Sequence, residues 1–67
     1  MLTGQRIEAA RNHAGIPIYI MCNAMDLLTE SEYESVVNRN KNLTIYQQIM
    51  IFTLFESYPE LVPQLCE

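Results

Sequence analysis

The 67-residue chain has little cysteine, histidine or basic charge. Cys22 and Cys66 are its only cysteines and His13 is its only histidine, so the four grouped ligands of a zinc site are missing. Because no signal peptide is evident, the cysteines indicate buried thiols, although a Cys22–Cys66 disulfide stays open for a secreted chain. His13 has no nucleophile or second ligand near it in sequence. We therefore expect no metal, no cofactor and no enzymatic activity.

Basic residues are outnumbered by acidic ones, four to eight, and the formal net charge is −4. This balance disfavours non-specific nucleic-acid binding, which depends on basic surface. It leaves specific binding open, because only the local field at the docking face matters. No apolar run approaches the roughly 20 residues that a membrane-spanning helix needs. The sequence therefore predicts a cytoplasmic protein that has no membrane partner.

Hydrophobic residues make up 49% of the chain, which excludes a disordered polar polymer. The length suits a single domain over residues 1–67 with a marginal core. Small domains without disulfides or metals often oligomerise, and this chain has more apolar positions than so small a core easily absorbs. We therefore expect a homodimer built on the last helix and the C-terminal turn. The candidate interface residues are Ile51, Leu54, Phe55, Tyr58, Leu61 and Leu65.

Start and stop signals divide the chain into four or five short helices. Thr3 is a good N-cap and Gly15 a good end for the first helix. Pro17 suits the first helical position of the second helix. Capping-box sequences at Thr29 and Thr44 open the third and fourth. The expected helices cover residues 3–14, 17–26, 29 to about 37 and 44–58, followed by a short turn after Pro59 that carries Leu61, Val62 and Leu65 inward.

Helical periodicity also predicts which faces point inward. One stripe on the second helix contains Met21, Ala24, Met25 and Leu28. One on the fourth contains Ile45, Ile49, Phe52 and Phe55, with Ile51, Leu54 and Tyr58 alongside. Strands are not supported, because neither a hairpin signal nor sustained alternation is present. The sequence therefore predicts an all-α fold, a compact bundle of four to five helices.

Several short sequences lie within these expected helices and the turns between them. They are Gly4-Gln5-Arg6-Ile7, Arg11, Ala14-Gly15-Ile16, Met21-Cys22, Ala24-Met25, Thr29, Tyr33 and Val36. Their order and spacing resemble the Cro/Xre-type helix-turn-helix repressors, and residues 54–62 are similar to the ending of antitoxin-type members. The resemblance implies a lambda-repressor-like helix-turn-helix fold that binds operator DNA as a dimer, with its third helix in the major groove.

The resemblance also assigns candidate DNA-binding residues. They are Glu30, Ser31, Glu34 and Ser35 on the third helix, and Asn38, Arg39, Asn40 and Lys41 at its end and in the following loop. Side chains of the loop can donate to phosphates, which positions a protein without specifying sequence, or they form an ordinary polar turn. Arg11 is expected to play a structural part by pairing with an acid such as Glu34 or Asp26.

Two departures from the family pattern bear on function. Asp26-Leu27-Leu28 stands where the family's turn usually carries glycine. The third helix lacks the Arg, Lys and Gln that repressors use to read bases, and it carries Glu30, Glu32 and Glu34 instead. These acids can stabilise a helix start, read cytosine, or face a basic protein partner. The alternative function is therefore an interaction module that does not bind DNA, of an anti-repressor, antitoxin-like or DNA-mimicking kind.

Overall fold

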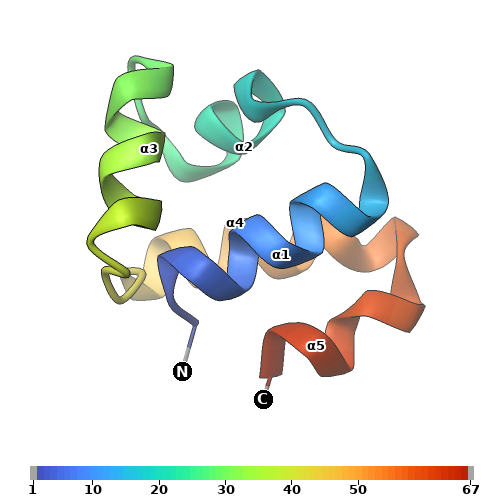
Figure 1. The fold of residues 1–67 in the computed structure, drawn as a ribbon. Coiled ribbons are helices and arrows are strands. Elements are labelled where there is room, and N and C mark those ends of the chain that lie inside the picture. The colour runs from blue at the N-terminus through green and yellow to red at the C-terminus, as the bar shows by residue number, and fades with distance from the viewer. Residues whose placement is uncertain (1, 67) are drawn as a thin grey trace.

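The computed structural model describes residues 2–66, with residue 66 by its backbone alone, as five α-helices and two short 3-10 turns without a strand (Figure 1). The elements are α1 (Gly4–Ala14), α2 (Ile18–Met25), α3 (Glu30–Asn38), α4 (Ile45–Leu54), η1 (Phe55–Ser57), η2 (Pro59–Leu61) and α5 (Val62–Cys66). The predicted all-α fold, a small helical bundle, is confirmed.

Local capping chemistry sets most of the helix ends. Thr29 accepts a hydrogen bond from the backbone N–H three residues on, and Thr44 forms a complete capping box. Gly15 ends α1 in the left-handed conformation, with φ 74°. The predicted breaks before α2, α3 and α4 are therefore confirmed. Helix α2 begins one residue later than predicted. Pro17 has an extended ψ of 150°, so it is the N-cap of α2 and not its first helical residue.

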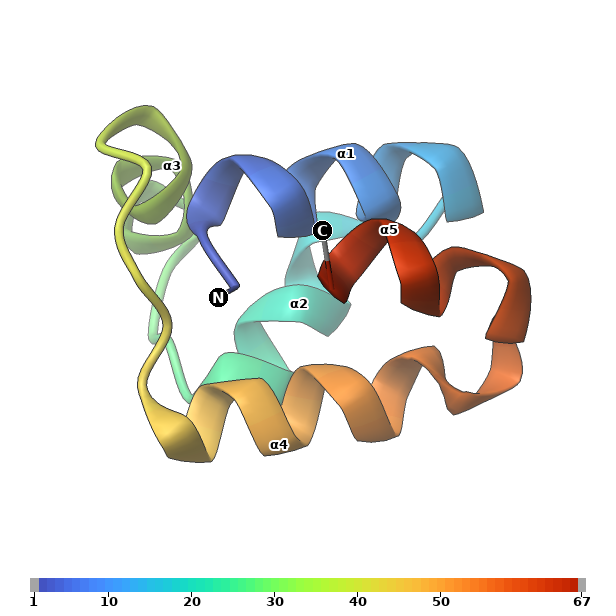
Figure 2. The same ribbon diagram turned by 90° about the horizontal axis from the view of Figure 1, so that it is seen from below.

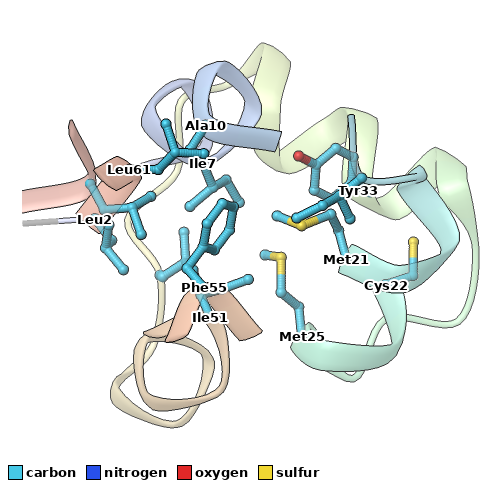
Figure 3. Close-up of a cluster of buried hydrophobic side chains, with 13 residues drawn as sticks. Leu2, Ile7, Ala10, Met21, Cys22, Met25, Tyr33, Ile51, Phe55 and Leu61 are labelled. Atoms are coloured by element: carbon cyan, nitrogen blue, oxygen red, sulfur yellow. The ribbon is translucent and has the colours of Figure 1, made fainter. Parts of the chain in front are cut away.

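The core is built from one buried face of each helix (Figure 3). Phe55 lies at its centre with Ile7, Met21 and Ile51 around it, and all four are fully buried. Burying a side chain of this size contributes roughly 1.5–3 kcal/mol relative to leaving it exposed. The bundle is therefore held by a small set of large apolar contacts.

The structure buries only part of the stripe predicted for the fourth helix. Ile51 and Phe55 point into the core, whereas Ile45 and Ile49 are 76% and 58% exposed. Because α4 is apolar nearly all round, its pattern alone does not select a face, and packing against α2 decides. The predicted dimer interface is corrected accordingly. Ile51, Phe55, Leu61 and Leu65 are core residues, and half-buried Leu54 and Tyr58 pack against the same core.

The start of α1 pairs with the loop between α3 and α4 through the backbone. Thr3 and Asn42 form an isolated antiparallel bridge. Gly4 N–H donates to the carbonyl of Lys41 at 2.9 Å, and the N–H of Leu43 donates to the carbonyl of Leu2 at 3.1 Å. This pairing holds the loop after α3 in one position.

The turn between α2 and α3 begins at Asp26, which takes the left-handed conformation with φ 58° and ψ 42°. Leu28, predicted to point inward, is 90% exposed, because the turn carries it off the buried face of α2. Cys22 is buried as a free thiol, and its Sγ donates to the carbonyl of Thr29 at 3.6 Å. Burial raises the pKa of this thiol. Cys66, the other half of the conceivable disulfide, has its side chain outside the described part of the chain.

Replacing Asp26 with glycine is expected to stabilise the protein by about 0.5–1 kcal/mol, because glycine adopts the left-handed conformation without a Cβ penalty. Asp26→Asn removes only the negative charge at the C-terminal end of α2 and should gain a few tenths of a kcal/mol, about 0.3. The free energies of unfolding of the two variants in urea separate the conformational contribution from the contribution of the charge. A glycine variant less stable than wild type would contradict the argument.

Candidate nucleic-acid interface

Helices α2 and α3 form a pair joined by the short turn at residues 26–29 (Figure 1). Helix α3 lies at the edge of the molecule and packs against α1 and α2. Its inward residues are buried Tyr33 and half-buried Val36 and Val37. The opposite face of α3 is therefore available to a ligand.

That outward face carries Ser31, Ser35 and Asn38, which fall on the side opposite Tyr33 at helical spacing. Ser31 and Asn38 are exposed and Ser35 is half-buried. All three side chains both donate and accept hydrogen bonds and carry no charge. This stripe (Ser31, Ser35, Asn38) can therefore contact base edges without an electrostatic penalty of its own.

The three glutamates of α3 have different surroundings. Glu32 Oε1 accepts a hydrogen bond at 3.2 Å from the N–H of Leu28, one residue before the Thr29 N-cap. The predicted capping box at Thr29 is therefore only half formed, and this carboxylate holds the turn before α3. Glu30 and Glu34 are exposed, and the single ion pair found among residues 2–66 involves neither of them. Two exposed carboxylates therefore border one side of the outward stripe.

The loop after α3 combines a structural residue with two exposed cationic side chains. Asn40 has φ 47°, and its Oδ1 accepts a hydrogen bond from the N–H of Gln5 at 3.0 Å. This bond caps α1, a task expected of Thr3, whose side chain makes no capping bond. Asn40 is thereby occupied, whereas the side chains of Arg39 and Lys41 are exposed on a loop that the backbone pairing fixes.

Arg11 does not pair with Glu34 or Asp26 as predicted. It pairs with Glu8 one turn earlier on α1, through two hydrogen bonds of 2.7 and 2.8 Å. A third nitrogen of Arg11 donates to the carbonyl of Ile16 at 2.8 Å. The correction has a simple cause, since residues three apart on a helix are neighbours.

Tyr33 completes this network by donating its hydroxyl hydrogen to Glu8 at 2.9 Å, which ties α3 to α1. The Arg11 hydrogen bonds lower the pKa of Glu8, and the same bonds raise the pKa of Arg11. Burial, with the hydrogen bond to Glu8, raises the pKa of Tyr33. The network therefore sets the angle at which α3 stands on the domain.

Leu28 is a candidate contact residue, although helical periodicity predicted that it would lie in the core. It precedes the Thr29 cap and is 90% exposed at the start of α3. An apolar side chain there can contact a thymine methyl group in the major groove, or a protein partner. Its position directly before a capping residue is the signal that places it outside the helix.

Protein-family models, curated proteins and solved structures were compared with the chain, and none of them matches it. The resemblance to Cro/Xre-type repressors therefore remains a prediction. Between residues 2 and 66, no cluster of three metal-ligating side chains is present. No helix in that range is long and apolar enough to cross a membrane.

Proposed function

We propose that this protein is a small helix-turn-helix regulator that binds operator DNA as a dimer, with α3 in the major groove. The observation that carries the proposal is the outward stripe of Ser31, Ser35 and Asn38, which is uncharged and hydrogen-bonding. The side-chain amide of Asn38 can make two hydrogen bonds to the edge of an adenine, and serine hydroxyls can hydrogen-bond to any base.

Phosphate contacts come from Arg39 and Lys41 in this proposal. Both side chains are exposed directly after α3, on a loop held against the start of α1. Cationic contacts of this kind position a protein on DNA and make its affinity depend on salt. Asn40 serves the same end indirectly, because its side chain fixes the loop.

Glu30 and Glu34 oppose DNA binding, because they approach the phosphates whenever α3 enters the groove. Replacing both with glutamine should strengthen binding by about tenfold for each protomer at low salt, given roughly 0.7 kcal/mol for each screened charge pair. The gain should shrink as salt rises. A Glu56→Gln, Glu60→Gln variant is the matched control, since it changes the net charge equally at exposed positions after α4.

Replacing Arg39 and Lys41 with alanine tests the phosphate contacts separately. Binding should weaken alike on all sequences, and the slope of log affinity against log salt should fall by about 2 for each protomer. The measurement is fluorescence anisotropy at about 50 mM and about 200 mM salt. The probes are a random-sequence duplex pool and the duplexes selected from it. Undetectable binding by wild type and all variants, even at the lower salt, would rule out the regulator.

The exposed carboxylates favour a second candidate function, a protein-interaction module that meets a basic partner through Glu30 and Glu34. The same double glutamine variant then weakens the complex, chiefly by slowing association, because charge complementarity steers encounter. The two functions therefore predict opposite effects of one variant. Wild-type DNA binding that requires Glu30 or Glu34 would instead mean that a carboxylate reads a cytosine amino group.

A further inference from the structure

The first half of α4 presents an apolar face to solvent. This face consists of Ile45, Tyr46 and Ile49, which are 76%, 58% and 58% exposed. It is opposite the face that buries Ile51 and Phe55 in the core. We call it the α4 apolar face. Its three side chains lie on adjacent turns of one helix and form a continuous patch.

The size of this patch bears on its occupant. With about 200 Å² for a large side chain, the three exposed fractions correspond to roughly 400 Å². That is half of the roughly 800 Å² that each partner contributes to a standard interface. Half-buried Met50 and Phe52 border the patch and extend the area that a partner helix would cover.

Charge also restricts the occupant. The chain carries a net charge of −4, so two copies repel each other over much of their surface. From Ile45 to Leu54, α4 contains no charged residue. Two α4 helices can therefore pack together with no like charges between them. Figure 2 places α4 along one edge of the molecule and α1 along the opposite edge, with α2 between them.

From these observations we infer that the α4 apolar face binds a second copy of this chain. The contact is a two-fold packing of α4 on α4, with Ile49 of both copies near the axis. It replaces the interface predicted from sequence, whose central residues are core residues.

This inference identifies the dimer contact of the proposed regulator. The contact itself does not depend on the proposed function, but its role in DNA binding rests on that proposal. The contact leaves α3 free, since α3 packs on α1 and α2 whereas α4 packs on α2.

The chain offers a matched pair of variants for the test, because Tyr19 on α2 and Tyr46 on α4 are both 58% exposed. Sedimentation equilibrium of the full chain, without DNA, should detect a wild-type dimer when the protein concentration is raised to roughly 500 μM. Tyr46→Ser should weaken the dimer at least about tenfold, because the lost contact occurs twice. Tyr19→Ser should leave the dissociation constant within about threefold.

Ile49→Asp places two carboxylates at the axis and should give a monomer whose helical circular dichroism matches that of wild type. Asn12→Asp, at an exposed position of α1, adds the same charge and should remain dimeric. A monomeric wild type, or equal effects of Tyr19→Ser and Tyr46→Ser, would overturn the inference. Because DNA is absent, failure here is distinct from failure of DNA binding. The latter would appear as a dimer that has no affinity for duplex.

Discussion

Replacing Gly4 with alanine is expected to destabilise the protein by about 3 kcal/mol, a large part of the stability of so small a domain. A Cβ on Gly4 would overlap the carbonyl oxygen of Val36 and would lie 2.8 Å from the Cα of Val37. These are backbone atoms of α3, so no side-chain rotation relieves the overlap. Helices α1 and α3 would have to separate, which also strains the pairing of Gly4 with Lys41.

Gly15→Ala is the comparison for this prediction, because it separates close approach from backbone conformation. Gly15 has φ 74°, and among the described residues nothing lies within 4 Å of the place that an alanine methyl group would take. The expected loss there is about 1 kcal/mol, the cost of a left-handed conformation with a Cβ. Urea unfolding measures both losses. If the two variants lose the same stability, the tight contact between Gly4 and α3 does not exist in solution.

The second large effect is expected from Glu8→Gln, which should lose about 2 kcal/mol at neutral pH. Glutamine keeps the shape but removes the charge that accepts from both Arg11 and Tyr33. The side chains of Arg11 and Glu8 are 15% and 30% exposed, so solvent screens the pair only in part. Tyr33→Phe removes one hydrogen bond and should lose less, about 1 kcal/mol. Glu34→Gln, at an exposed position, should change stability by less than about 0.5 kcal/mol.

The Glu8 network also predicts how stability depends on pH. The pKa of Glu8 is lowered in the folded protein, from an ordinary value of 4.5. Its contribution is therefore complete above pH 4.5 and is lost as the pH falls through the folded-state pKa. Glu8→Gln should abolish this acid-side decrease. An unchanged acid limb in the variant would show that Glu8 is not the group responsible.

The alkaline side follows Tyr33, whose pKa is raised above its ordinary value of 10.0. A raised pKa gives stability that is complete below the unfolded-state value and is lost as the pH rises beyond it. Wild type should therefore begin to lose stability above about pH 10, and Tyr33→Phe should lose less over the same range.

The helix ends are the part of this fold that sequence chemistry determines. Thr29, Thr44 and Gly15 act on backbone groups within a few residues of themselves, so their effects need no knowledge of the rest of the chain. The all-α class follows from the same local signals. The outward residues of α3 could also be assigned, because Tyr33 marks the buried side and Ser31 and Ser35 fall opposite to it.

Tertiary structure alone decided the rest, because the deciding partners lie far away in sequence. Asn40 caps α1 across a separation of 35 residues, and Tyr33 reaches Glu8 across 25. Helix α4 shows the same limit in its packing. It is apolar nearly all round, so the choice of Ile51 over Ile49 for the core belongs to its contact with α2 and not to its own pattern. That choice leaves Ile49 and its neighbours on the surface, where we propose that a second copy binds.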